Sequence, residues 1–194
     1  MYKKNDIIRK IERNLYMKYL AIIFNGFEEE EAMAPFAILR RCKLDLTIAS
    51  ASTSCTGCHN ITLTDLTPLN KVDYKDYDCL ILPGGPHYRF LETEPKVKEI
   101  IDHFMAEKKM VAAICASPTI LGKMGYLEGK NYTCFTSMNA DFGGNYTDEG
   151  VTVDGNIISA KSVAYSLEFA YKIVEETQDS SVLENLFKRI YHEK

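Results

Sequence analysis

Short apolar segments alternate along the chain with segments whose apolar positions recur at helical spacing. The apolar, strand-like segments span 19–24, 44–50, 78–83 and 110–115. Helical patterns follow at 28–41, 94–107, 117–124, 162–177 and 181–192. Strands that are apolar on both faces and that alternate with amphipathic helices are typical of βαβ units. We therefore expect an α/β fold in which helices cover both faces of a mostly parallel sheet.

The first 16 residues carry a different pattern. They are rich in charge, and their few apolar residues have helical spacing. The acidic residues and the absence of serine argue against a transit peptide. We expect residues 1–16 to form a helical N-terminal extension. Residues 17–194 are expected to form a single domain, large enough to bury a core without disulfides.

Composition excludes several classes of function. The 23 basic and 27 acidic residues leave a net charge of −4, and no basic cluster is interleaved with aromatic residues as in nucleic-acid binders. No apolar run approaches the ~20 residues that span a membrane. Six cysteines occur without a secretory signal, which favours free thiols in the cytoplasm. We expect neither nucleic acid nor a membrane among the partners.

Three loops with chemically suggestive residues follow strand-like segments. They span residues 25–31, 83–88 and 115–118. Ligand sites in open α/β sheets form at the carboxyl ends of the strands. The three loops are therefore expected to converge on one crevice.

The stretch VAAICASPTI, residues 111–120, places Cys115 where a buried strand gives way to a helix whose first residues are Ser117 and Pro118. This arrangement predicts a nucleophile elbow. Helix N–H groups and the helix dipole at such a bend favour the thiolate, which predicts a lowered pKa for Cys115. The alternative is that Cys115 is a small apolar residue at the end of a buried strand.

Four consecutive carboxylates, residues 28–31, occupy the first turn of a predicted helix. Compensation of the helix dipole explains most of them. Glu31 differs because Ala34, Pro35 and Ile38 share its face, so its carboxyl group is expected to lean over apolar surface. Desolvation there would raise its pKa and let it hold a proton for a neighbouring group.

The stretch LPGGPHY contains Gly84 and Gly85 directly after a buried strand. Paired glycines allow close approach, and their N–H groups can bind a developing oxyanion, although such pairs also occur in ordinary turns. His87, two residues further on, is the one histidine that we expect near the crevice.

The stretch CTGCH, residues 55–59, fits two short cysteine motifs. Haem attachment and redox activity are both disfavoured, because neither an export signal nor a following helix accompanies the motif. A hairpin turn around Gly57 is the better interpretation. No second cysteine or histidine pair has the spacing that would complete a zinc site, so we expect no metal and no cofactor.

Taken together, three segments resemble the ThiJ/PfpI superfamily, in the branch of the Parkinson-linked protein deglycase and its bacterial relatives. They are GFEEEEAMAPFAILRR, DCLILPGG and AAICASPTILGKMGYLEGK. The similarity in order and spacing extends from about residue 17 to residue 176. It implies a flavodoxin-like three-layer sandwich and a homodimer.

The same resemblance implies roles for individual residues. Cys115 would be the reactive cysteine, Glu31 the buried glutamate hydrogen-bonded to it, and the N–H groups of Gly85 and Ala116 an oxyanion pocket. Ala116 stands where the protease-like branch has a histidine, so peptidase activity is not expected. Phe135 stands where the Parkinson-linked protein has a third site residue, also a histidine.

The leading hypothesis is an enzyme of the glyoxalase III or deglycase type. It would act on α-oxoaldehydes such as methylglyoxal, or on their protein adducts, without glutathione. The Cys115 thiolate would attack the aldehyde while Glu31, with or without help from His87, moves the proton. The rival hypothesis is a noncatalytic oxidative-stress protein, either a sensor in which Cys115 reacts with peroxide or a chaperone.

Overall fold

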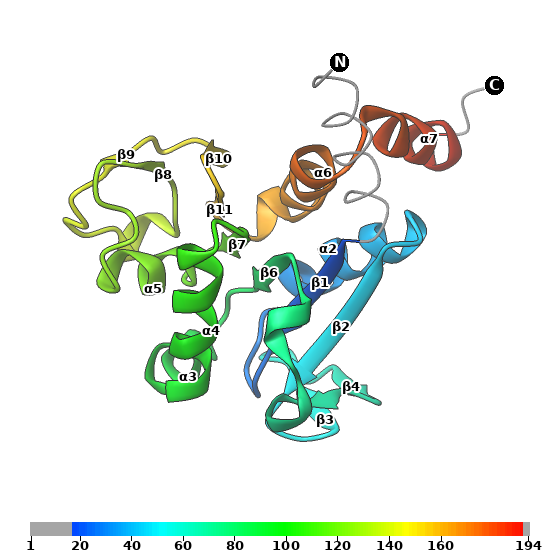
Figure 1. Ribbon diagram of the computed structural model, residues 1–194, viewed down its shortest axis with the longest axis horizontal. Helices are drawn as coiled ribbons and strands as arrows, with labels where there is room; N and C mark the ends of the chain where they lie inside the picture. Colours follow the sequence, from blue (N-terminus) through cyan, green and yellow to red (C-terminus); the bar gives the residue numbers. More distant parts are fainter. Residues whose placement is uncertain (1–16, 192–194) are drawn as a thin grey trace, which may run out of the picture.

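The computed structural model describes residues 17–191, so the helix expected at 1–16 lies outside the described residues. The main sheet has seven strands in the order β10-β11-β7-β6-β1-β2-β5 (Figure 1). Every neighbouring pair in it is parallel except β10 and β11. Two small two-stranded sheets, β3-β4 and β8-β9, stand beside it.

The strands of the main sheet are β1 (Lys18–Ile22), β2 (Asp45–Ser50), β5 (Thr67–Pro68), β6 (Cys79–Leu82), β7 (Met110–Ile114), β10 (Val151–Asp154) and β11 (Ile157–Ala160). The small strands are β3 (Ser54–Thr56), β4 (Thr62–Thr64), β8 (Asn131–Tyr132) and β9 (Asn145–Tyr146). The helices are α2 (Glu29–Arg41), α3 (Tyr88–Thr93), α4 (Pro95–Ala106), α5 (Pro118–Lys123), α6 (Ser166–Thr177) and α7 (Ser180–Ile190).

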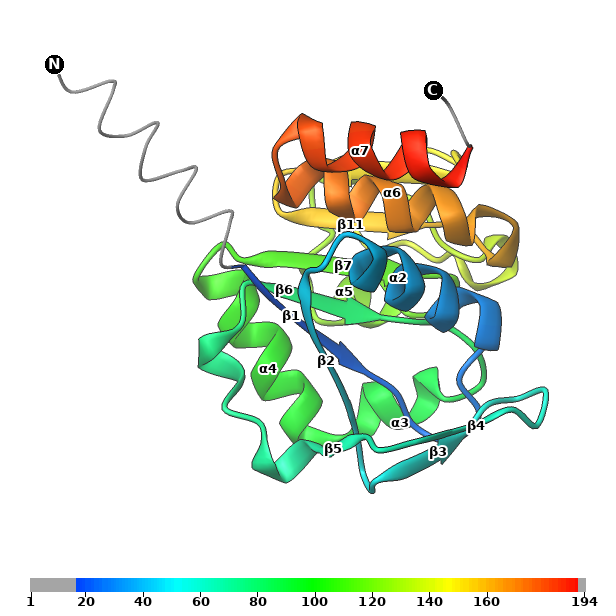
Figure 2. The same cartoon turned by 90° about the vertical axis from the view of Figure 1, so that its right-hand side faces the viewer.

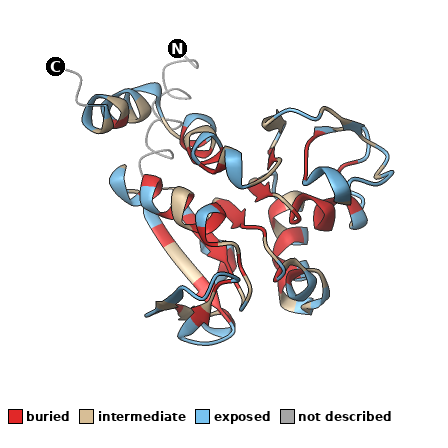
Figure 3. Ribbon diagram, turned by 180° about the vertical axis from the view of Figure 1, so that it is seen from behind, coloured by how far each residue is buried: buried red, intermediate tan, exposed pale blue. Residues whose placement is uncertain are grey.

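Helices cover both faces of the sheet and make three layers. α2 and α6 pack on one face, with α7 outside α6, and α4 packs on the other face together with α3 and α5 (Figure 2). Along β1, Tyr19 and Ala21 belong to the core beneath α2 and α6, whereas Leu20 and Ile22 belong to the core beneath α4. The continuous apolar run of β1 therefore serves two cores, and Figure 3 shows this buried centre in red.

The predicted fold class is confirmed, as are the four strand segments and five helical patterns proposed from periodicity. The hairpin around Gly57 is also confirmed, because β3 and β4 pair antiparallel on either side of it. The hairpin of β10 and β11 was not predicted, although β11 is fully buried and pairs with β7. Within residues 17–191, the helices are too short or too polar to cross a membrane.

Candidate active site

Cys115 occupies the sharp bend between β7 and α5. Its φ angle is +63°, a left-handed conformation that side chains seldom adopt and that is typical of strained functional positions. The surrounding backbone holds it in place: the Cys115 N–H donates to the Ala160 carbonyl oxygen at 2.9 Å, and the Phe135 N–H donates to the Cys115 carbonyl oxygen at 2.8 Å. Cys115 is therefore the residue at a nucleophile elbow, as the sequence pattern predicts.

Glu31 lies beside this bend from the first turn of α2 and is 1% exposed. The Glu28 side chain caps that turn, since its Oε2 accepts a hydrogen bond from the Glu31 N–H at 2.7 Å. Burial raises the pKa of Glu31 to about 7, and the charge of Glu28 adds to this shift, while the Cys115 thiol and the N–H groups of Gly84 and Val163 oppose it. The surroundings of Glu31 therefore desolvate its carboxyl group, as the sequence predicts.

Gly84 allows Glu31 and Cys115 to approach each other. A side chain at position 84 would collide with Glu31 Oε2, with the Cys115 side chain and with the Ile114 carbonyl oxygen. Among the described residues, Glu31 Oε2 is buried without a well-formed hydrogen bond. A buried carboxyl oxygen left in this state beside a thiol is ready to accept the thiol proton.

The pKa of Cys115 differs from the sequence-based expectation. Burial, followed by the charge of Glu31 and the hydrogen-bonding influence of its carboxylate, raises the pKa of Cys115 to about 12. The N–H groups of Gly85 and Ala116 lower it, but the effect is smaller. The prediction of a lowered thiol pKa was therefore wrong, because it counted the N–H groups at the bend and not the neighbouring carboxylate.

Two backbone N–H groups point toward the sulfur atom, those of Gly85 and Ala116. In the described part of the chain neither N–H has a backbone acceptor. Gly85 has a φ of +97°, and a side chain there would collide with the Glu28 N and the Gly26 carbonyl oxygen, so only glycine fits. These free donors are suited to binding a negative oxygen formed next to Cys115.

His87 lies in the core beneath the crevice rather than in it, with no exposed surface. Its Nδ1 accepts from the Phe24 N–H at 3.1 Å, so its Nε2 carries the proton and donates to the Pro83 carbonyl oxygen at 2.8 Å. Burial lowers the pKa of His87 to about 4. The suggestion that His87 assists Cys115 does not fit these contacts, because both ring nitrogens are already engaged.

Ser117 also has a role that the sequence does not reveal. It stands at the N-cap position of α5 but makes no cap, and its Oγ instead donates to the Pro83 carbonyl oxygen at 2.6 Å. The Pro83 carbonyl thus holds both Ser117 and His87, which fixes the loop carrying Gly84 and Gly85. The convergence of the three strand ends is completed by Glu28, whose N–H donates to the Gly84 carbonyl oxygen at 2.9 Å.

The side chain of Phe135 is 43% exposed. Its backbone N–H supports the bend at Cys115, but its phenyl ring can neither donate nor accept a proton. A contact missed from the sequence comes from Val163, which follows β11 and whose N–H faces the Glu31 carboxyl group. The sequence does not indicate this contact, because β11, the strand that precedes Val163, has no distinctive sequence pattern.

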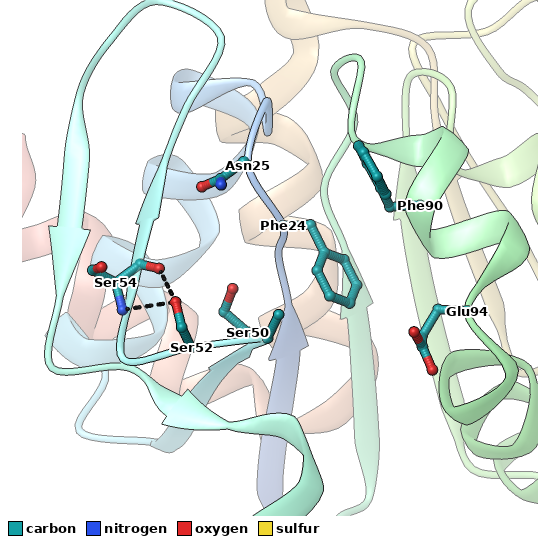
Figure 4. Close-up of a pocket in the computed structure, with 8 residues that line it drawn as sticks. Phe24, Asn25, Ser50, Ser52, Ser54, Phe90 and Glu94 are labelled. Carbon is teal, nitrogen blue, oxygen red and sulfur yellow. Dashed lines mark hydrogen bonds between the residues drawn. The ribbon is translucent and has the colours of Figure 1, made fainter.

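A pocket of about 310 Å³ opens at the carboxyl ends of β1 and β2 (Figure 4). Phe24 and Phe90 form its apolar wall, Glu94 stands at one side, and Ser52 and Ser54 are joined by hydrogen bonds at the other. Neither Cys115 nor Glu31 lines this pocket. It is a separate hollow on the same end of the sheet.

The fold and the elbow together define a class of protein, a flavodoxin-like α/β sandwich with a cysteine nucleophile elbow facing a buried glutamate. The sequence profile of the DJ-1/PfpI family matches residues 17–176, and the chain belongs to that family. The predicted resemblance is thereby confirmed.

Individual relatives are of moderate similarity. The Parkinson disease protein 7 homolog of Danio rerio is 31% identical over 84% of this chain and 90% of its own. The Deglycase PfpI of Pyrococcus furiosus is 33% identical over 75% of this chain and 90% of its own. The crystal structure of Drosophila melanogaster DJ-1beta superposes with a TM-score of 0.83 at 28% identity, covering 90% of this chain and 97% of that chain.

Proposed function

We propose that the protein is an enzyme that converts α-oxoaldehydes, with methylglyoxal as the simplest substrate, to 2-hydroxy acids without glutathione. Protein adducts of such aldehydes are the related substrates, in keeping with relatives that are named deglycases. The observation that carries the proposal is the buried Glu31 carboxyl group beside Cys115 on the elbow. No metal or cofactor takes part in the proposed steps.

The first step is addition of Cys115 to the aldehyde. With a pKa of about 7, a substantial share of Glu31 is ionised near neutral pH and can act as a base, whereas Cys115 starts as a thiol. Glu31 takes the thiol proton as sulfur bonds to the aldehyde carbon, and the carbonyl π electrons move to the oxygen. The N–H groups of Gly85 and Ala116 stabilise the resulting oxyanion, which regains a proton from Glu31 to give a hemithioacetal.

The second step moves a proton between the two carbons of the adduct. The Glu31 carboxylate removes the proton from the former aldehyde carbon and passes it to the neighbouring ketone oxygen, which gives an enediol. It then takes the hydroxyl proton of the first carbon and delivers it to the second carbon. The product is a hydroxyacyl thioester on Cys115. Water then cleaves the thioester, so that methylglyoxal and one water become lactate and the thiol is regenerated. The net reaction needs no oxidant, because one carbon is oxidised while its neighbour is reduced.

Glu31 performs both proton transfers in this scheme. Phe135 occupies the place of the family histidine, and His87 is committed to Phe24 and Pro83. A single acid–base group must then serve successive steps. We accordingly expect slower turnover than in a relative that retains the histidine.

Lactate formation from methylglyoxal by purified protein, without glutathione, tests the proposal. The matched variant is Cys115→Ser, which keeps the size and position of the side chain and removes the nucleophile. Lactate formed by the wild type and almost entirely lost in Cys115→Ser supports the proposal. Equal lactate from both proteins, or from neither, refutes it.

The sensor hypothesis has less support from the site. Peroxide reacts with thiolates, and burial with the Glu31 charge raises the pKa of Cys115 to about 12. Mass spectrometry after mild peroxide treatment distinguishes the two hypotheses. Rapid conversion of Cys115 to a sulfinic acid, in a protein that forms no lactate, would favour the sensor.

We also propose that the protein is a homodimer of the cytoplasm. Val163 and Leu167 expose 40% and 54% of their surfaces beside α2, and with Met33 and Ala34 they line a shallow apolar hollow. Such a patch on an otherwise polar surface suits a second copy. Light scattering is expected to give twice the chain mass for the wild type and the chain mass for Leu167→Glu; a monomeric wild type would refute the dimer.

A further inference from the structure

Away from Cys115, side chains of the kinds that bind metal ions lie together between the start of α2 and the β3–β4 hairpin. Glu29, Cys58 and His59 each offer one ligand atom, and these atoms lie within 4.8 Å of one another. The hairpin is fastened beside α2, since the Cys58 N–H donates to the Phe27 carbonyl oxygen at 2.8 Å (Figure 2). Carboxylate, thiolate and imidazole are the three side-chain ligands that zinc uses in proteins.

The distances suit a tetrahedral ion. Cys58 Sγ lies 3.6 Å from Glu29 Oε2. Bonds of about 2.3 Å from zinc to sulfur and about 2.0 Å to oxygen, at a tetrahedral angle, place the two ligand atoms about 3.5 Å apart. On the other side, His59 Nε2 lies 3.8 Å from Glu28 Oε1. Glu28 thus lies next to the three-residue cluster and is the candidate for a fourth ligand.

The buried member of the cluster is already oriented. Glu29 is 4% exposed, and its Oε1 accepts hydrogen bonds from the N–H groups of His59 at 2.7 Å and Ile61 at 3.3 Å. This leaves Oε2 facing Cys58. Gly57 makes the approach possible, because a side chain there would collide with the Glu29 carboxylate. Backbone donors that fix a ligand in this way are typical of the groups that support metal sites.

Glu28 is oriented in the same manner. Its Oε2 is occupied by the Glu31 N–H, so Oε1 is the oxygen that faces His59. One carboxylate therefore lies against Cys58 and the other faces His59. A divalent cation placed between these groups would offset their repulsion and displace the thiol proton to solvent.

We propose that Glu29, Cys58 and His59, with Glu28 as the fourth ligand, form a zinc site that ties the β3–β4 hairpin to the start of α2. The site is separate from the chemistry of Cys115 and does not depend on the proposed function. Without metal, the Cys58 thiol donates a hydrogen bond to the Glu29 carboxylate, and the His59 ring lies near the Glu28 carboxylate. The sequence does not indicate this group of ligands, because Glu29 lies 29 positions before Cys58.

Metal titration of the full chain tests the site. Metal-free wild type is titrated with Zn²⁺ by calorimetry and with Co²⁺ by absorption spectroscopy, in which a thiolate ligand gives a charge-transfer band and tetrahedral geometry gives intense visible bands. We expect one equivalent of either ion, both spectral features, and a higher melting temperature with Zn²⁺. Loss of a ligand in His59→Ala should weaken Zn²⁺ binding at least about tenfold.

The decisive comparison is between cysteines. Cys58 is exposed, so Cys58→Ser is expected to fold with an unchanged circular dichroism spectrum and to lose the charge-transfer band. Cys42→Ser, at a half-buried cysteine remote from the cluster, and Cys115→Ser are expected to retain it. Failure of the wild type to bind, or a charge-transfer band that survives in Cys58→Ser, would overturn the proposal.

Discussion

Glu31 and Cys115 meet across the space that Gly84 leaves open, with the carboxyl oxygen of one buried against the side chain of the other. Burial raises the pKa of both groups, to about 7 for Glu31 and about 12 for Cys115. Near neutral pH, Cys115 is therefore a thiol, and the fraction of Glu31 that is ionised can accept its proton when the sulfur reacts.

The space at Gly84 can be filled by a single methyl group. We expect Gly84→Ala to push Glu31 away from Cys115, to destabilise the fold by ~1–3 kcal/mol through overpacking, and to abolish most lactate formation. Chemical denaturation and the lactate assay measure the two effects. Gly125→Ala is the control, because a side chain there meets nothing within 4 Å although its φ is +84°. Its activity should be unchanged; equal losses in both variants would contradict the account.

The pH dependence of the reaction should follow the ionisation of Glu31. The carboxylate is the base, so kcat/KM is expected to rise with pH through an apparent pKa of about 7 and to level off above it. In Glu31→Gln, most of the activity should be lost, and the remaining kcat/KM should no longer rise with pH in this range. A wild-type profile that is flat between pH 5 and about 8 would show that a group other than Glu31 accepts the proton.

Direct titration of the thiol gives a further test. The Glu31 carboxylate raises the pKa of Cys115 through its charge and its hydrogen-bonding influence, so Glu31→Gln should lower that pKa. Thiolate absorbance in the ultraviolet, taken as the difference from the matching protein with Cys115→Ser, measures it. A higher thiol pKa in Glu31→Gln would instead mean that Glu31 acts as a proton donor that stabilises the thiolate.

His87 makes the stability of the fold depend on pH. Its pKa is about 4 when folded and near 6.5 when unfolded, so the unfolded chain binds the extra proton in that interval. The contribution of His87 to the free energy of unfolding therefore has its full value above pH 6.5. It falls as pH drops toward 4, by up to about 3 kcal/mol.

The variant His87→Gln should lack this loss. Glu31 acts in the opposite direction, since its raised pKa makes stability fall as pH rises from 4.5 to 7, but its contribution cancels in the difference between wild type and variant. Urea denaturation at pH 5 and pH 7 measures that difference. If the wild type and His87→Gln lose the same stability at pH 5, then His87 is not held neutral by its contacts with Phe24 and Pro83.

Much of this structure follows from local pattern. The apolar runs that become β1, β6 and β7 are buried on both faces, and Cys115 and the paired glycines sit where those strands end, so the crevice was predictable. Glu31 was predictable because Ala34 and Ile38 share its face of the helix.

Other features depend on contacts between distant segments. The pKa of Cys115 is set by a carboxylate from α2, which a strand-to-helix pattern does not include. Ser117 is a good N-cap residue by propensity, yet its hydroxyl donates to Pro83, 34 positions earlier. The sequence predicts His87 near the crevice, but only the folded structure shows that it is buried beneath it with both ring nitrogens engaged.

The most direct test of the central claim is a double-mutant comparison of lactate formation. If Glu31 and Cys115 act as one proton-sharing unit, Glu31→Gln and Cys115→Ser should each remove nearly all activity, and the protein carrying both changes should be no slower than the slower single variant. Losses that multiply in the double variant would show two groups that act independently and would contradict the account.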